Sequence, residues 1–164
     1  MKKGLKILAY LASALIILIL VAVAYISIAL PNVGDAPADF KVEITDEKVE
    51  HGKYLANHVM VCVDCHSVRD FSLFAGPIVP GTENSGGEIF DQTMGFPGIF
   101  ISANITPAGI GDWTDGELLR LITTGVRKDG SVIFPIMPYK NYGQLDMEDL
   151  EAIIAYIRTL EPKN

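Results

Sequence analysis

The chain has 164 residues, a formal net charge of −7 at pH 7 and a sequence pI of about 4.8. Beyond residue 30 it holds all 20 acidic residues but only 10 of the 13 basic ones, a formal charge of about −10. This negative charge disfavours binding to nucleic acid, because the phosphates would repel it. The roughly 134 residues beyond residue 30 are enough for one domain.

The N-terminal segment is uncharged from Ile7 to Leu30. Its 24 residues would rise roughly 36 Å as a helix, more than the roughly 30 Å hydrocarbon core of a bilayer. A cleaved signal peptide has a shorter apolar region of roughly 7 to 15 residues, although Ala22, Val23 and Ala24 resemble a cleavage site. We therefore predict a retained transmembrane anchor over residues 1–30, with cleavage as the alternative.

Charges on either side of this stretch predict its orientation. Lys2, Lys3 and Lys6 precede it, whereas acidic residues such as Asp35 are among the first charges that follow. The positive-inside rule then keeps the N-terminus in the cytoplasm and exports everything beyond Pro31. We predict a single-pass protein of the bacterial inner membrane whose C-terminal domain lies in the periplasm.

Residues 31–44 combine prolines, a glycine and small side chains, which is typical of a short tether. The first helix of the exported part is expected to begin near Thr45, with Asp46 and Glu47 in its first turn, where negative charge suits the helix dipole. Apolar residues then recur at helical spacing up to Val59 and lead towards Cys62.

Residues 62–66 read Cys-Val-Asp-Cys-His and contain the only two cysteines of the chain. C-x-x-C-H is the attachment signature of a c-type haem. Positions i, i+3 and i+4 of a helical turn share one face, so Cys62 and Cys65 can reach the two vinyl groups of one porphyrin while His66 lies under the iron. The motif therefore predicts one covalently bound haem c, with His66 as an iron ligand.

Three other interpretations of the motif are weaker. A structural zinc site needs four ligands, and Cys62, Cys65 and His66 supply at most three, with no second C-x-x-C in the chain. A thioredoxin-like redox pair is typically set in a βαβ pattern, which the flanking sequence does not offer. An accidental match without a cofactor is the third; haem is favoured because no cysteine lies outside the motif.

A long stretch from Arg69 to Asp112 follows, broken by eight glycines and four prolines and containing five of the seven phenylalanines. A compact domain rarely holds so long a loop unless the loop has a function. We favour a flap that shields a haem edge from water. The alternative is an ordinary loop with its own small aromatic cluster.

Two further helices are predicted from their termini. Residues 114–117 read Thr-Asp-Gly-Glu, a capping box, and Gly125 is placed to end the helix that they begin. The last helix is expected to start near Asp146 and to stop before Pro162. Both carry apolar residues at helical spacing: Leu118, Leu121 and Ile122, then Leu150, Ile153, Ile154, Ile157 and Leu160.

The far side of the iron needs a ligand unless the site is open, and the candidates are His51, His58, Met60, Met94, Met137 and Met147. His58 and Met60 lie on the helix that approaches His66, from which the opposite haem face is awkward to reach. A core role is favoured for Met147, and Met94 stays a candidate. We favour Met137, because the prolines on either side of it fix an extended loop that presents the side chain rigidly.

Seven segments, which together cover most of residues 47–160, add a family resemblance: Gly52 to Leu55, Cys62 to His66, Asn104 to Pro107, Gly109 to Thr114, Gly125 to Gly130, Pro135 to Tyr139 and Asp149 to Arg158. In this order they resemble the single-haem, class I-type cytochrome c domain of membrane-bound bacterial respiratory cytochromes. The resemblance extends to the cytochrome subunits of alcohol and gluconate dehydrogenases.

The resemblance implies a mostly α fold, with a small cytochrome c-type helical domain around one haem over residues 45–164. The long Gly/Pro-rich loop would be an insertion in this domain. The resemblance also implies that the helix near Gly52 crosses the C-terminal helix and that Met137 is the sixth ligand. Three residues would either neighbour the haem propionates or have ordinary structural roles: Trp113, Arg127 and Tyr139. In one respect the chain departs from the dehydrogenase subunits, which carry three haem motifs where this chain has one.

Two classes of function follow. With His66 and Met137 both bound, the iron has no place for a substrate, and the protein is an electron carrier rather than an enzyme. Its partners would be redox proteins: a dehydrogenase or quinol-oxidising complex as donor, and a terminal oxidase or soluble carrier as acceptor. The alternative is a haem enzyme or sensor, a peroxidase or gas-binding protein, with an open sixth site. This alternative is less favoured, because the haem segments have no spare acid–base residues near them.

Overall fold

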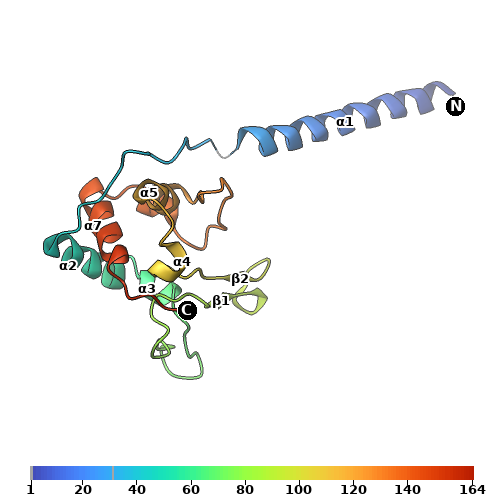
Figure 1. The fold of residues 1–164 in the computed structure, drawn as a ribbon. Helices are drawn as coiled ribbons and strands as arrows, with labels where there is room; N and C mark the ends of the chain where they lie inside the picture. The colour runs from blue at the N-terminus through green and yellow to red at the C-terminus, as the bar shows by residue number, and fades with distance from the viewer. Residues whose placement is uncertain (1, 31) are drawn as a thin grey trace. The chain divides into compact units, whose positions relative to one another are not determined.

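The computed structural model describes residues 2–30 and 32–164 (Figure 1). Its contacts divide the chain into two compact units, one that ends at Gly34 and one that runs from Asp35 to Asn164. Pro31, the first residue of the predicted tether, lies outside the described residues. Helices predominate in the described chain, so the predicted mostly α class is confirmed.

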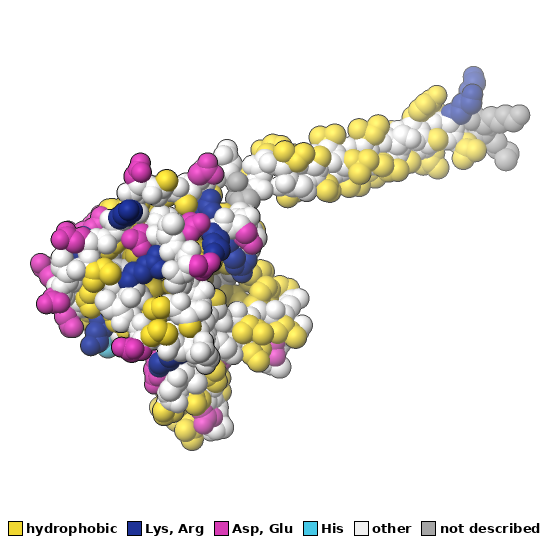
Figure 2. Space-filling view, viewed as in Figure 1, with side chains coloured by type: hydrophobic (Ala, Val, Ile, Leu, Met, Phe, Trp, Pro, Cys, Tyr) yellow, Lys and Arg dark blue, Asp and Glu magenta, His cyan; other side chains and the backbone are white. Residues whose placement is uncertain are grey.

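The N-terminal unit is a single long helix, α1, over Lys2–Ala29. Its side chains from Lys3 onwards are exposed and predominantly apolar, as Figure 2 shows, and the span Lys3–Ala29 has a mean hydropathy of 2.9. Among the described residues, α1 is the one helix long and apolar enough to cross a membrane. The predicted long apolar helix is thus confirmed, and its membrane topology stays a prediction.

The second unit is built on the crossing of α2, Asp46–Tyr54, and α7, Met147–Arg158. At their contact a Cβ added to Gly52 would lie 1.9 Å from the carbonyl oxygen of Ala152. Only a residue without a side chain allows the two backbones to approach this closely. The predicted crossing of these helices at Gly52 is therefore confirmed.

The helix termini follow the sequence signals. Thr45 accepts a hydrogen bond from the Lys48 N–H (3.3 Å) and caps α2. Helix α5, Asp115–Thr124, begins with the predicted capping box, in which Thr114 and Glu117 each bind the other's backbone N–H. It ends at Gly125, whose φ of 73° lies in the left-handed region that suits glycine.

The remaining elements are short. Two two-residue strands, β1 and β2, pair antiparallel with Phe90 opposite Phe100. A π-helical turn continues α2 and leads to α3, and α6 follows the proline-flanked loop. The bounds are Leu55–Val59 for the π-helical turn, Cys62–Cys65 for α3, Ile89–Phe90 for β1, Gln92–Met94 for a 3-10 turn, Phe100–Ile101 for β2, Pro107–Ile110 for α4 and Tyr139–Tyr142 for α6.

One hydrophobic cluster joins the π-helical turn, α4, α5 and α7. Its most deeply buried members are Ile153 and Ile154 of α7, with 1% and 0% of their surface exposed. Burying each such side chain stabilises the fold by about 1.5–3 kcal/mol. The full cluster, here called the core cluster, consists of Leu55, Met60, Ile110, Leu118, Leu119, Ile122, Leu150, Ile153, Ile154 and Ile157.

Residues 37–42 lie against this core although they fall within the predicted tether. The Val42 N–H donates to Asp115 Oδ2 (2.9 Å), and Phe40 packs against the core cluster. A Cβ on Gly116 would lie 2.1 Å from the carbonyl oxygen of Pro37. The sequence gives no periodic signal for this packing, because the segment has no regular secondary structure.

We predict that Gly52→Ala destabilises the protein by about 1–3 kcal/mol or more, because its Cβ overlaps the Ala152 carbonyl and α2 and α7 must separate. The measurement is chemical unfolding of the detergent-solubilised protein. Gly98→Ala is the matched control: its Cβ would lie 3.5 Å from Phe100, an ordinary contact, so its change should stay within about 0.5 kcal/mol. Equal stability of the two variants would contradict the close helix crossing.

Candidate functional site

The Cys-x-x-Cys-His motif forms one tight helical turn. Helix α3 spans Cys62–Cys65, and the His66 N–H closes the turn on the Cys62 carbonyl oxygen (2.9 Å). The predicted common face of the two thiols and the imidazole thus has the backbone that it requires. Val61, directly before the turn, has a φ of 51°, a left-handed conformation that is strained for a β-branched residue.

The imidazole of His66 is held by one hydrogen bond. Its Nδ1 lies 2.7 Å from the carbonyl oxygen of Ala103. A carbonyl accepts only, so Nδ1 carries the proton and Nε2 keeps its lone pair. Burial lowers the pKa of His66, which favours the same neutral form. Among the hydrogen bonds of the described residues none engages Nε2, so this nitrogen is available to bind a metal.

The two thiols are free, and burial favours their protonated forms. Burial raises the pKa of Cys62 to about 11 and also raises that of Cys65. Redox pairs of the thioredoxin type need the opposite shift, because the thiolate is the nucleophile. Within the described residues no three His, Cys, Asp or Glu side chains form a group that could hold a metal ion. A haem iron needs no such group, since it takes at most two ligands from the protein.

Met137 lies in the loop between the second and third predicted helices, as the sequence indicates. Its half-buried side chain packs against the core cluster, and so does that of Cys62. Tyr142, in the helix that follows the loop, donates its hydroxyl to the Met60 carbonyl oxygen (2.9 Å), two residues before the motif. The loop that carries Met137 is thereby tied to the backbone that leads into the motif.

The other sulfur candidates lie in different surroundings. Met60 is a member of the core cluster and is 5% exposed. Met94 and Met147 are both about half exposed, at 48% and 51%. The core role favoured for Met147 is therefore wrong: the residue is the first of α7, where its side chain faces solvent.

The two remaining histidines lie on the surface. His51 pairs with Asp149 through Nε2 (2.7 Å), which joins α2 to α7. His58 is exposed and its ring lies beside that of Tyr54, with the centroids 5.6 Å apart.

The long insertion reaches the loop that carries Met137 through an aromatic cluster. Phe90, Phe96 and Phe100 come from the β1–β2 region, and Phe134 stands three residues before Met137. Phe100 and Phe134 are stacked, with centroids 4.3 Å apart and an interplanar angle of 22°. The predicted aromatic cluster thus extends beyond the insertion, a contact that sequence reasoning missed because Phe134 is remote in the chain. Phe71 and Phe74 do not join it and are exposed.

The three residues named beside the propionates have structural contacts. Arg127 donates to Ser131 Oγ and to the Val132 carbonyl oxygen. Lys128 lies over the ring of Trp113, and the ring of Tyr139 packs against the backbone of Gly125.

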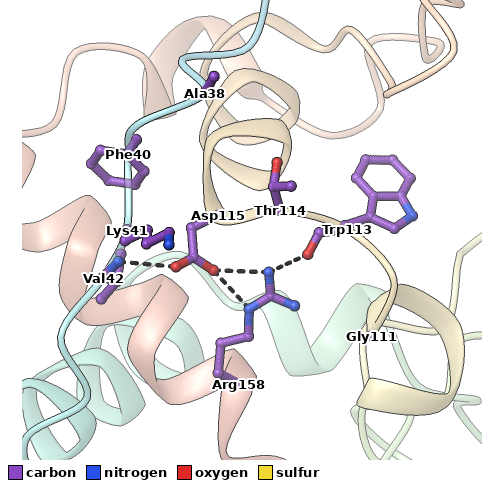
Figure 3. A pocket seen from close by; sticks show the side chains of 9 residues that line it. All are labelled: Ala38, Phe40, Lys41, Val42, Gly111, Trp113, Thr114, Asp115 and Arg158. Atoms are coloured by element: carbon purple, nitrogen blue, oxygen red, sulfur yellow. Dashed lines mark hydrogen bonds and ion pairs between the residues drawn. The ribbon is translucent and has the colours of Figure 1, made fainter.

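A surface pocket of about 400 Å³ lies elsewhere, between residues 38–42 and the start of α5 (Figure 3). At its floor Arg158 forms an ion pair with Asp115 (2.8 Å) and donates to the Trp113 carbonyl oxygen (2.5 Å). Asp115 also accepts from the Val42 backbone. These side chains bond to one another, and they link residues 38–42 and α7 to the start of α5.

No family model matches the chain. Over 70% of its length it is 34% identical to the gluconate 2-dehydrogenase cytochrome c subunit of Pantoea cypripedii. It is 35% identical over 66% to the quinone-type alcohol dehydrogenase cytochrome c subunit of Gluconacetobacter polyoxogenes, and 35% identical over 68% to the fructose dehydrogenase cytochrome subunit of Gluconobacter japonicus. The chain spans only 21–23% of the length of these relatives.

The predicted resemblance to dehydrogenase cytochrome subunits is therefore confirmed. These relatives are electron-carrier subunits of dehydrogenase complexes rather than catalytic enzymes. A further relative, 32% identical over 63% of the chain, is a diheme cytochrome c-type protein of Cereibacter sphaeroides.

We predict that Val61→Gly stabilises the protein by about 0.5–1 kcal/mol, because glycine relieves the strain of a φ of 51°. Val59→Gly is the control. Val59 is also exposed but lies in the right-handed π-helical turn, so glycine should lower stability there by up to about 1 kcal/mol. Thermal unfolding measures both, and a destabilised Val61→Gly would contradict the strain.

Proposed function

We propose that this chain is an electron carrier that binds one haem c covalently through Cys62 and Cys65. The observation that carries the proposal is the single turn that presents both thiols next to an imidazole held at Nδ1. Similarity to the cytochrome c subunits of dehydrogenases supports it, since it implies electron transfer by a c-type haem. The donor set fits the group: two free thiols at the i, i+3 spacing and a neutral imidazole with Nε2 available.

Each residue of the site has a distinct role in this proposal. Cys62 and Cys65 would hold the porphyrin by thioether bonds, and His66 would bind iron through Nε2. The haem, when bound, supplies a one-electron couple between ferric and ferrous iron. The Ala103 carbonyl keeps His66 in the tautomer that can bind metal and fixes the plane of its ring.

Met137 is proposed as the second axial ligand. Three observations support it: its loop is tied to the motif by Tyr142, its side chain packs on the same cluster as Cys62, and Met60 is buried in the core. A thioether ligand favours ferrous iron and raises the reduction potential. Two protein ligands would leave no open position for a substrate, which is the property of a carrier.

The insertion is proposed to shield the haem edge from water. Its aromatic cluster includes Phe134, so the rings of the insertion pack against the loop that carries Met137. Excluding water from one edge disfavours the more highly charged ferric state and raises the reduction potential.

The anchor and the charges near it support a location in the bacterial inner membrane, with the helical unit in the periplasm. Helix α1 has the length and hydropathy of a membrane span, and three lysines precede its apolar stretch. A retained anchor would hold the carrier close to membrane-bound redox enzymes.

The proposed partners are redox proteins. A dehydrogenase is the first candidate donor, because the relatives are subunits of gluconate, alcohol and fructose dehydrogenases. A quinol-oxidising complex is the second, and a terminal oxidase or a soluble carrier would accept the electron. The net negative charge of the exported part favours partners with basic docking surfaces.

The ligand assignment predicts that the reduced wild-type protein binds carbon monoxide weakly and slowly, because Met137 occupies the sixth position. Met137→Ala should leave the haem covalently attached, abolish the methionine–ferric charge-transfer absorption and bind carbon monoxide rapidly. Optical spectra of the purified proteins test this, with Met94→Ala as the matched control. Rapid, tight binding by the wild type would indicate an open site, as in a haem enzyme or gas sensor, and would overturn the carrier assignment.

The shielding role predicts that Phe134→Ala lowers the reduction potential, because water then reaches the haem edge and stabilises ferric iron. Phe74→Ala is the control, since Phe74 lies in the insertion but outside the aromatic cluster and is fully exposed. Redox titration measures both, and a potential that is unchanged in Phe134→Ala would argue against shielding by this cluster.

A further inference from the structure

We propose that Asn104 is a positioning residue for His66: its side chain fixes the direction of the Ala103 carbonyl that accepts the Nδ1 proton. The inference rests on the proposed role of His66 as the haem ligand. It gives the Asn-Ile-Thr-Pro segment, residues 104–107, a specific role. It also makes Lys163, near the C-terminus, a residue that supports the site.

The argument begins with the covalent structure of the chain. The carbonyl of Ala103 and the N–H of Asn104 belong to one planar peptide unit, so the orientation of one fixes that of the other. The Ala103 oxygen points to His66 Nδ1 at 2.7 Å. Whatever prevents rotation of this peptide therefore also holds the imidazole.

The side chain of Asn104 is locked by three hydrogen bonds. Its Oδ1 accepts from the backbone N–H of Thr106 (2.8 Å) and from Thr106 Oγ1 (2.7 Å). Its Nδ2 donates to the carbonyl oxygen of Lys163 (2.6 Å). Both ends of the amide are engaged, so the side chain has one orientation that satisfies all its partners.

The partners of Asn104 are themselves fixed. Thr106 is 1% exposed, and its hydroxyl also accepts from the Lys163 N–H (3.2 Å). Gly109 approaches so closely that a Cβ there would lie 2.2 Å from the Asn104 carbonyl oxygen. Lys163 is tied to the insertion by an ion pair with Glu83 (2.5 Å).

The backbone on either side of the Ala103–Asn104 peptide is paired with residues 84–88. Ser102 donates its N–H to the Glu88 carbonyl oxygen (2.9 Å), and Ile105 donates to that of Asn84 (3.0 Å). These bonds hold the flanking residues, and Gly86 packs against the Ala103 carbonyl, since a Cβ on Gly86 would lie 2.7 Å from its oxygen. The Asn104 side chain adds a hydrogen-bonded restraint at the other end of the same peptide.

The chemical consequence lies in the electron density of the imidazole. A strong Nδ1–H···O bond makes Nε2 a better donor and stabilises the ferric state, so it lowers the reduction potential. If the carbonyl turns away, this bond weakens and the potential rises. Asn104 thus acts on the iron through the Ala103 carbonyl and His66, without contact with the haem.

Four uncharged or conservative variants of the full-length, detergent-solubilised holoprotein test the proposal by redox titration. Asn104→Ala removes all three side-chain bonds and should shift the ferric–ferrous equilibrium constant about three- to ten-fold towards ferrous, where ten-fold is 59 mV. Thr106→Val removes one of the three bonds to Asn104, together with the bond from the Lys163 N–H, and should shift it in the same direction by less. Thr106→Ser keeps the hydroxyl and should match the wild type. Lys163→Met loses the ion pair but keeps the backbone carbonyl, and should also match.

The proton resonance of His66 Nδ1–H in the ferrous protein provides a second readout, which should move upfield in Asn104→Ala and in Thr106→Val. A potential and a resonance equal to those of the wild type in both variants would overturn the proposal. If Asn104→Ala fails to fold, the Thr106→Val and Thr106→Ser pair decides the question, since only the valine variant should shift. Absence of covalent haem from the wild type would instead overturn the proposed function.

Discussion

The site depends on the hydrogen bond between His66 Nδ1 and the Ala103 carbonyl oxygen (2.7 Å). This bond connects the helical turn that carries both cysteines to the irregular insertion that follows it. It selects the imidazole tautomer with a free Nε2, and because the acceptor belongs to the backbone, its geometry is set by the fold. The long insertion is therefore part of the surroundings of His66.

The bond needs a rigid frame, and α2, α5 and α7 provide it. The missing side chain at Gly52 lets α2 lie directly on the Ala152 backbone of α7, and the core cluster packs α7 against α5 and the π-helical turn. The π-helical turn carries the chain from this frame to Val61, whose left-handed φ redirects it into α3. From α3 the imidazole of His66 reaches the Ala103 carbonyl of the insertion.

Local signals in the sequence were sufficient to predict α2, α5 and α7, because a capping box, a terminal glycine and apolar periodicity act within one or two turns. Thr45, Thr114 and Gly125 each mark a terminus as expected. The contacts that complete the site are long-range and lack such signals: the acceptor for His66 is a backbone atom 37 residues away, and the aromatic cluster recruits Phe134 from another loop. Met147 shows the converse limit, since a residue expected in the core from its place in the first turn of the last helix faces solvent.

The central claim is that Cys62 and Cys65 bind one haem covalently, and intact mass spectrometry of the denatured protein tests it most directly. The full chain should be produced in a bacterium with haem c attachment machinery, beside a variant that combines Cys62→Ser and Cys65→Ser. The account predicts that the wild-type chain is heavier than its polypeptide by the mass of one haem, and that the variant has the polypeptide mass alone. A wild-type chain that shows only the polypeptide mass, or a variant that retains haem after denaturation, would contradict it.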